Sequence, residues 1–304
     1  MRIGIDIGGT KTEAVALGAD GAVVAQARLD TARGPAGVIG TALEALRRLG
    51  GAATDLRGAE SIGVGIPGLV DSEHGVVEYA FNLGLERLDL ATALRERTGV
   101  PVRVENDVKA AALGATHLLD IEGSMAFLNL GTGLAAGLVT DGRILRGAQG
   151  IAGEIGHVSV DPAGIACPCG QRGCLETVAS GSGLARQWPS RDPLPAAELF
   201  RAAADGDPLA AEVRDRLVHG TAQAVRLLVL TVDPGTVVVG GGLRHLGASL
   251  FDRVRDEFAA LGARSAFFAS LGLAERLRVL PDGLAAAAVG TALIGQAPTP
   301  APTP

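Results

Sequence analysis

Every cysteine of this 304-residue chain lies in one short stretch, GEIGHVSVDPAGIACPCGQRGCLE, residues 153–176. His157, Cys167, Cys169 and Cys174 are close enough along the chain to bind a single ion. Three thiolates and one imidazole favour tetrahedral zinc, and four protein ligands with no open position are typical of a structural site. The alternatives are a disulfide with one spare thiol, or three inert buried cysteines. We expect zinc, because the three cysteines cluster in a chain that has no others.

Two carboxylates flank this cluster. Glu154 lies three residues before the histidine, and Glu176 lies two residues after the last cysteine. A zinc ion that fixes the loop would also fix both acids. Carboxylates held in this way suit hydrogen bonds to hydroxyl groups, as in a sugar.

A glycine-rich turn near the N-terminus predicts a phosphate site. Asp6, Gly8, Gly9, Thr10 and Lys11 lie on a predicted hairpin turn. Glycines let backbone N–H groups point into a concavity that accepts an anion. In this interpretation Thr10 adds a hydroxyl donor, Lys11 adds charge, and Asp6 orients a phosphate-bound Mg²⁺ through water.

A similar turn occurs in the second half of the chain, at Gly131, Thr132 and Gly133. Aligning IDIGGTK with LNLGTGL pairs Asp6 with Asn129, 123 residues later. Neither loop has the GxxxxGK[ST] spacing of the mononucleotide P-loop, and either one alone would more often be only a tight turn. The repetition favours two phosphate loops in a duplicated fold.

A third glycine cluster, Gly240, Gly241 and Gly242, follows the predicted strand TVVV. A flat ring could lie against bare backbone at this point. The alternative is a strand-to-helix turn that needs unusual φ values.

The segment Glu105-Asn106-Asp107 lies where a predicted strand ends and a helix begins. Asn or Asp at such a place is first of all a helix N-cap. A carboxylate at a strand end can also face a cleft between domains. Phosphoryl transfer needs positioning, charge neutralisation by Mg²⁺ and a carboxylate that accepts the proton of the attacking hydroxyl. Asp107 is our candidate for this base.

The elements that position these residues follow from hydrophobic periodicity. Strands first and alternating strands and helices later indicate two α/β domains with mixed sheets around a shared cleft. The predicted strands comprise a strand-turn-strand unit over 1–17, a second such unit from 125, and 22–29, 61–66, 101–104, 236–242 and 276–280; the predicted helices are 35–49, 89–98, 108–119, 182–188, 195–204, 208–230, 247–261 and 283–295.

Composition excludes several other classes of protein. The formal charge is −6, and no cluster of basic residues stands out, which argues against nucleic acid as a partner. No apolar run of about 18 residues is present, so we expect no membrane span. The N-terminus has no signal-peptide pattern, and thiols available for zinc suit a reducing compartment. We therefore expect a cytoplasmic protein.

Taken together, these motifs resemble those of the ROK family (repressors, open reading frames and kinases). The resemblance covers nearly the whole chain, and its most specific parts are the zinc motif and GEIGH. The matching segments are DIGGTK at Asp6, GIPGLVD at Gly65, NLGL at Asn82, END at Glu105, LGTG at Leu130, DGRILRGAQGIAGEIGH ending at His157, CPCGQRGCLE ending at Glu176, and GGG at Gly240.

The resemblance implies an actin-like ATPase (ribonuclease H-like) duplicated fold of two α/β domains. We expect a first domain over 1–115 and a second over 116–282. A C-terminal helix, 283–296, would return to the first domain. The tail 297–304 is Pro-rich and is predicted to be disordered.

The resemblance also implies a sugar kinase that uses ATP, Mg²⁺ and a structural Zn²⁺ to phosphorylate a hexose, commonly at O6. Asp107 would be the base, and one imidazole nitrogen of His157 would bind zinc while the other faces the sugar. We expect a homodimer or homotetramer. The residues implied to contact the sugar are Gly68, Asn82, Asn106, Asp107, Glu154, His157 and Glu176.

Two departures from the family pattern stand out. Ala135 and Ala136 replace frequent glycines of the second phosphate loop, where their methyl groups would lie near phosphate. Leu85 replaces a frequent tryptophan, which would change the wall on the sugar side.

Repressors of this family carry a helix-turn-helix before the ATPase-like part. Here the phosphate loop begins at residue 6 and leaves no room for one, so a kinase is expected. Glucose is the favoured substrate. N-acetylglucosamine, N-acetylmannosamine, fructose and allose are the alternatives, and a non-catalytic sugar sensor is the alternative from another class.

Overall fold

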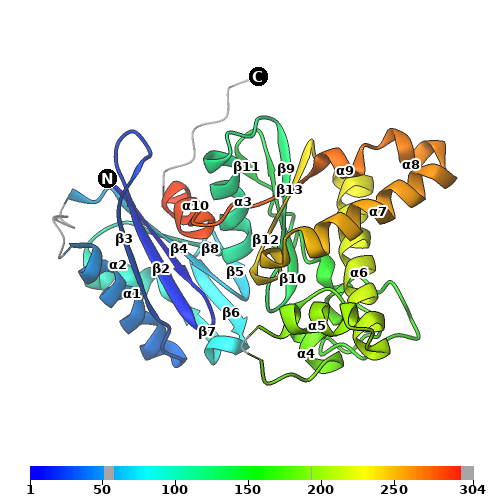
Figure 1. Cartoon of the computed structure of the whole chain (residues 1–304). Coiled ribbons are helices and arrows are strands. Elements are labelled where there is room, and N and C mark those ends of the chain that lie inside the picture. The colour runs from blue at the N-terminus through cyan, green and yellow to red at the C-terminus, as the bar shows by residue number, and fades with distance from the viewer. Residues whose placement is uncertain (51–57, 193, 296–304) are drawn as a thin grey trace. The chain divides into compact units, whose positions relative to one another are not determined.

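The computed structural model describes residues 1–50, 58–192 and 194–295, which form two compact units (Figure 1). Unit 1 contains Met1–Asp120, Gly142–Ala152 and the described residues from Gly283 onward, and unit 2 contains Ile121–Asp141 and Gly153–Asp282. The chain therefore passes between the units more than once. The predicted disorder of 297–304 concerns residues outside those described.

Unit 1 is organised around a five-stranded sheet. The hairpin β1 (Arg2–Ile7) and β2 (Lys11–Leu17) is antiparallel, and β3 (Val23–Asp30) extends it at one edge. On the other side β1 pairs in parallel with β4 (Ser61–Ile66), and β4 with β8 (Val102–Asn106). The β4 residues are all buried, as expected for a central parallel strand covered on both faces.

A second, smaller sheet in unit 1 was missed by the sequence analysis. It contains β5 (Leu69–Asp71), β6 (Val76–Ala80) and β7 (Leu85–Asp89), all antiparallel. These strands are short and separated by few residues, so their periodicity is too brief to identify. The remaining elements of unit 1 are α1 (Gly34–Gly50), η2 (Phe81–Leu83), α2 (Leu90–Thr98), α3 (Asp107–Leu118), β11 (Arg143–Ile144) and α10 (Ala286–Ile294).

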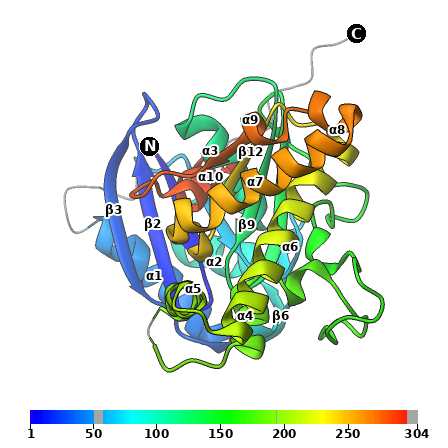
Figure 2. The same cartoon turned by 45° about the vertical axis from the view of Figure 1, so that its right-hand side comes forward.

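Helix α10 packs tightly on α3 and on the main sheet of unit 1, and both views show the two helices side by side (Figures 1 and 2). Glycines permit this approach. A Cβ placed on Gly114 of α3 would lie 1.8 Å from the carbonyl oxygen of Ala286, and one on Gly290 of α10 would lie 1.8 Å from that of Ala110. The two backbones are thus in direct contact.

Unit 2 repeats the topology of unit 1. The hairpin β9 (Ser124–Leu130) and β10 (Leu134–Thr140) is antiparallel, β9 pairs in parallel with β12 (Thr236–Gly240), and β12 with β13 (Leu277–Val279). The strand order β10-β9-β12-β13 in this sheet corresponds to β2-β1-β4-β8 in the first. The repeat predicted from the two glycine turns is therefore present in the fold.

The core of unit 2 lies between this sheet and its helices. The long helix α6 contributes Leu217, Val225 and Leu228, and Phe251 of α7 is almost completely buried. The other elements of unit 2 are η3 (Ile155–His157), η4 (Leu175–Thr177), α4 (Gly181–Gln187), α5 (Pro195–Ala204), α6 (Pro208–Val232), η5 (Gly242–Leu246), α7 (Ala248–Arg264), α8 (Ala266–Ser270) and α9 (Leu273–Arg276).

Within the described parts of the chain, no helix is both long enough and apolar enough to span a membrane.

Candidate functional site

The first glycine turn joins β1 to β2 and is closed by a backbone hydrogen bond from Gly8 N to Lys11 O, 2.9 Å. Thr10 is exposed, and its carbonyl accepts from Thr31 N at 3.0 Å. The Lys11 ammonium forms an exposed ion pair with Asp30. Lys11 would therefore have to leave this partner before it could add its charge to a phosphate.

Asp6 at the end of β1 carries a buried side-chain oxygen, Oδ1, that has no hydrogen-bond partner among the described residues. Burial raises the pKa of this carboxyl well above its usual 3.8, and the nearby charges of Asp107 and Glu13 raise it further. A buried oxygen without a partner costs free energy unless a donor or cation satisfies it. The environment of Asp6 thus suits the binding of a cation.

Asn106 and Asp107 divide two tasks at the junction of β8 and α3. Asn106 is the N-cap, since its Oδ1 accepts from Val108 N at 3.1 Å and Lys109 N at 3.2 Å. Asp107 is the first helical residue and is only partly buried. A Cβ on Gly65 would lie 3.5 Å from both the Asp107 Cα and Asp6 Oδ1. The candidate base and the buried carboxylate are therefore close neighbours.

Asn82 lies beside the first phosphate loop. A Cβ placed on Gly9 would be 3.1 Å from Asn82 Nδ2. The Arg33 guanidinium donates two hydrogen bonds to Asn82 O, 2.9 and 2.7 Å, which fix the short helix η2. Unit 1 thus brings a predicted sugar contact next to a predicted phosphate loop. Arg33 was missed because nothing in the sequence connects it to position 82.

Gly68 lies between the small sheet and the END segment. Its φ is +109°, and a side chain there would meet Glu78 O at 2.7 Å. Its carbonyl accepts a long hydrogen bond, 3.4 Å, from Asn106 Nδ2. Only glycine fits this position, and it contacts the amide of a second predicted sugar residue.

Glu105 and Arg146 form an ion pair that the sequence analysis did not predict. Glu105 is 2% exposed, and its Oε2 accepts from Arg146 Nε at 2.7 Å. Its other oxygen, Oε1, accepts from Asn106 N at 3.0 Å. This buried carboxylate therefore links the END segment to the loop that follows β11.

In unit 2 the second phosphate loop is closed by Gly131 N donating to Gly133 O at 3.1 Å. The start of α4 is attached to it, because Gly181 N donates to Gly131 O and Ser182 N to Thr132 O, at 2.8 and 3.0 Å. The loop is thus held by backbone contacts, and Thr132 remains exposed.

The three glycines after β12 differ in their surroundings. A Cβ on Gly240 would collide with the Phe127 ring at 2.1 Å, and one on Gly241, at φ +80°, would lie 2.4 Å from Leu130 C. A Cβ on Gly242 would meet no described atom within 4 Å. Gly241 therefore packs against the second phosphate loop, and Gly242 is the one that leaves space for a ring.

The four predicted metal ligands come together in the loop of unit 2. Their ligand atoms all lie within 4.8 Å of one another. Cys169 Sγ is 3.7 Å from Cys174 Sγ, and Cys167 Sγ is 3.9 Å from His157 Nδ1. Tetrahedral zinc, with Zn–S of about 2.3 Å and Zn–N of about 2.0 Å, places its ligands about 3.8 Å apart for two sulfurs and about 3.5 Å for sulfur and nitrogen. The donor set and spacing therefore fit zinc.

Two of the thiols differ strongly in their environment. A backbone hydrogen bond from Gln171 is the main cause that lowers the pKa of the exposed Cys169 to about 6. Burial raises the pKa of the Cys174 thiol to about 12. Zinc binds thiolates, so a bound ion would deprotonate both.

The two predicted sugar carboxylates lie on either side of this loop. Glu154 is exposed at the start of η3. Glu176 is partly buried, and its Oε2 accepts from Leu134 N at 3.1 Å, directly after the second phosphate loop. His157 turns Nδ1 toward Cys167, which leaves Nε2 on the side away from that sulfur. Unit 2 thus places predicted metal, sugar and phosphate contacts on neighbouring segments.

The departures from the family pattern lie away from the positions that the sequence analysis gave them. Leu85 is 1% exposed and belongs to the core of unit 1, so it forms no surface for a sugar. Ala135 and Ala136 lie on β10, after the turn, and Ala136 N donates to Gly153 O at 2.7 Å. The expectation that their methyls crowd a phosphate is therefore wrong for Ala136, which is core.

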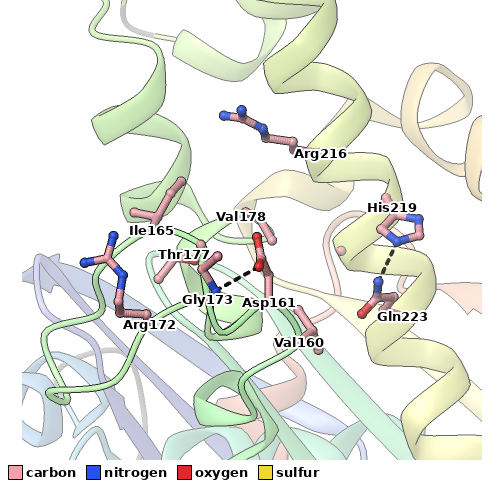
Figure 3. A pocket seen from close by; sticks show the side chains of 13 residues that line it. Val160, Asp161, Ile165, Arg172, Gly173, Thr177, Val178, Arg216, His219 and Gln223 are labelled. Carbon is pink, nitrogen blue, oxygen red and sulfur yellow. Dashed lines mark hydrogen bonds between the residues drawn. The ribbon is translucent and has the colours of Figure 1, made fainter.

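A pocket of about 640 Å³ lies between helix α6 and the loop that carries the predicted zinc ligands, residues 157–174, called the zinc loop below (Figure 3). Two of its basic side chains are paired with carboxylates. Arg216 forms an ion pair with Glu212, and His219 Nδ1 is 3.1 Å from Glu257 Oε2. Arg172 lies on the opposite, loop side. None of the predicted site residues lines this pocket.

The chain is similar to known sugar kinases over most of its length. The model of the ROK family matches residues 2–290. A glucokinase of Halalkalibacterium halodurans is 34% identical over 85% of this chain and 85% of its own, and an N-acetylmannosamine kinase of Yersinia pseudotuberculosis is 32% identical over 83% and 86%. A ROK glucokinase of Streptomyces griseus, solved with glucose and AMPPNP, is 29% identical, covers 97% of this chain and 98% of its own, and has a TM-score of 0.76.

The chain belongs to the ROK family and has the duplicated, actin-like ATPase fold of its members. This confirms the resemblance and the fold class that the sequence predicted.

Proposed function

We propose that this chain transfers the γ-phosphoryl group of ATP to a hydroxyl of glucose, with Asp107 as the general base. The chain is a sugar kinase: its family, the named kinases among its relatives and the complex of a family member with glucose and AMPPNP all support this class. The choice of glucose rests on the glucokinases, which include the 34% identical relative.

The observation that carries the catalytic part is the neighbourhood of Asp107. Its carboxylate lies beside Asp6, and the same unit places Asn82 against Gly9 of the phosphate loop. We propose that the sugar binds with one hydroxyl next to Asp107 and another at Asn82, beside the phosphate loop. In this proposal Asp107 removes the proton as the oxygen attacks phosphorus, and ADP leaves.

The remaining residues are proposed to bind and orient the substrates. Glu154, Glu176 and His157 Nε2 would accept or donate hydrogen bonds to sugar hydroxyls, in addition to Asn82 and Asn106. Zinc would fix the loop that holds them. Bound Mg²⁺ would neutralise phosphate charge, and the buried Asp6 is the residue suited to hold it, through water.

N-acetylmannosamine is the second candidate substrate, because a kinase for it is 32% identical over most of the chain. The deciding measurement is kcat/KM with Mg-ATP for glucose, N-acetylglucosamine, N-acetylmannosamine, mannose, fructose and allose. A hundredfold preference, about 2.7 kcal/mol of differential transition-state binding, would name the substrate. A preference for an N-acetylated sugar would replace glucose by that sugar.

Asp107→Asn tests the role of the base. The amide keeps the size of the side chain but cannot accept the proton, so we expect turnover to fall by about 10²- to 10⁴-fold. Sugar binding, measured by isothermal titration calorimetry, should change little. Unchanged turnover would remove Asp107 from the mechanism, and a chain that binds sugar but turns over none of the panel would be a sensor.

A further inference from the structure

The loop after β11 has its two ends joined to each other, and its first residue is anchored in unit 1. Arg146 begins it and Ala152 ends it, and Ala152 N donates to Arg146 O at 3.1 Å. Midway, Gly150 lies against the small sheet, since its Cβ position is 3.4 Å from Val70 O. This loop, residues 146–152, leads by two further residues into Glu154, the first predicted sugar contact of unit 2.

The anchor of this loop is the pair of Arg146 and Glu105. Glu105 is almost completely buried, and its two oxygens bind different parts of the protein: Arg146 Nε at 2.7 Å and Asn106 N at 3.0 Å. A buried carboxylate needs such compensation, because an unpaired buried charge is costly. The pair therefore connects the C-terminal end of β8 to the start of the loop.

These contacts form one continuous path. It runs from the backbone of Asn106, beside the proposed base, through the Glu105 carboxylate to the Arg146 side chain. It continues through the Arg146 carbonyl to Ala152 N, and by the chain itself to Glu154. The next residue, Gly153, belongs to unit 2, where its carbonyl accepts from Ala136 N of β10 at 2.7 Å.

We propose that Arg146 and Glu105 form a positioning pair for the sugar kinase reaction. The pair fixes the loop 146–152 and thereby limits the freedom of the backbone that leads into Glu154 and His157. In this proposal the pair acts through the loop and not by touching the substrate. This inference rests on the proposed function, because the residues it positions are the proposed sugar contacts.

The test compares Arg146→Ala with Arg143→Ala. Arg143 lies in β11 just before the loop, is exposed, and forms no ion pair with any described residue, so its variant makes the same chemical change without breaking the path. For Arg146→Ala we expect kcat/KM for the sugar to fall about tenfold or more, with KM for ATP within about twofold of wild type. Arg146→Lys keeps the charge and should recover part of the loss.

A double-mutant cycle assigns the effect to the pair. Glu105→Gln and Arg146→Ala should each lower kcat/KM for the sugar. The double variant should have a kcat/KM no lower than that of the less active single variant. Additive losses would show that the two residues act separately and would overturn the proposal. Equal effects of Arg143→Ala and Arg146→Ala would also overturn it.

A measurement without turnover separates this inference from the proposed function. Hydrogen–deuterium exchange of the peptides covering 146–157 should quicken about tenfold in Arg146→Ala and stay as in wild type in Arg143→Ala. If wild type phosphorylates no sugar, the proposed function fails while the exchange result still decides whether the pair anchors the loop. If wild type is active and Arg146→Ala matches it in exchange and in kcat/KM, the pair is overturned alone.

Discussion

Replacing Asp6 by asparagine should stabilise the folded chain. In the structure one carboxylate oxygen of Asp6 is buried and has no hydrogen-bond partner among the described residues. The charges of Asp107 and Glu13 add repulsion. Asp6→Asn keeps the shape of the side chain and removes the buried charge, which is the costly part.

Asparagine leaves a polar atom at the same buried place, so only the cost of the charge is removed. Because the pKa of Asp6 lies well above its usual 3.8 and one pKa unit corresponds to about 1.4 kcal/mol, the gain is at least about 1.4 kcal/mol once the wild-type carboxyl is ionised. We expect the free energy of unfolding at pH 7.5 to rise by this amount in the absence of nucleotide and divalent cations. One kcal/mol corresponds to roughly 2 to 4 °C in domains of this size. The midpoint of thermal unfolding should therefore increase by at least about 2 °C.

The pH dependence of stability tests independently whether Asp6→Asn stabilises or destabilises the folded chain. The folded-state pKa of Asp6 is raised above its usual 3.8, so the stability that the protonated carboxyl contributes is complete below about pH 3.8. It is lost as the pH rises through the folded-state pKa. The variant lacks this loss, so its advantage over wild type should be absent at the acid end, grow as the pH rises, and become constant once folded Asp6 is ionised.

Differential scanning fluorimetry from pH 4 to 9 measures both features. Asp256→Asn is the matched control, since Asp256 is exposed on α7 and the same chemical change there removes no buried charge. An Asp6→Asn protein that unfolds at or below the wild-type temperature at pH 7.5 would refute the reasoning. We also expect this variant to lose activity, as is common when a destabilising group serves function.

Two further predictions concern the zinc loop and the packing of α10. Chelation of zinc should lower the free energy of unfolding by at least about 2 kcal/mol and release one ion per chain to a colorimetric reagent. The variant Cys167→Ser should bind no zinc. A wild-type chain that holds no zinc would refute the site. Gly290→Ala should lower the free energy of unfolding, measured by chemical denaturation, by at least about 1 to 3 kcal/mol, because its methyl would strike the backbone of Ala110. The control Gly40→Ala, with no described atom within 4 Å, should be neutral or stabilising. Equal stability of the two variants would show that α10 can shift.

Much of the fold was predictable because its signals are local. The boundaries of β4 were predicted to the residue, and those of α1 and α6 within two, since their hydrophobic runs are long and their ends carry turn or capping residues. The duplication was visible because both glycine turns join the two central strands of a sheet. These features depend on neighbours in the sequence.

The missed features depend on contacts between distant residues. Tyr79 is a local exception: strict alternation would place it with Val77 on the buried face of β6, yet a left-handed backbone, φ +56°, turns it outward to 60% exposure. Arg146 and Glu105 lie 41 positions apart, and neither has an unusual neighbour in sequence. Nothing in a one-dimensional pattern distinguishes such a pair from two surface charges.

The site residues were found for the opposite reason. Cysteines are rare in this chain, and a histidine and three cysteines within a short stretch have few roles other than metal binding. The role of Asn82 came from the family resemblance, whereas those of Asp107 and Glu154 were argued first from their places in the sequence. All three stay predictions. The structure adds the buried state of Asp6 and the neighbourhood of Asn82 and Gly9, which composition could not supply.

The position of α10 determines when unit 1 can be completed during synthesis. Cβ atoms on Gly4 and Gly63 of the central strands would lie 2.0 and 1.7 Å from carbonyl oxygens of Ala288 and Thr291, so α10 lies directly on the backbone of β1 and β4. The ribosome makes all of unit 2 before it reaches α10. Until then the apolar residues that α10 covers, such as Val15 and Leu17 of β2, stay exposed, and they remain so in a chain that stops before residue 283. Premature termination late in translation should therefore yield an aggregating product rather than a usable first domain.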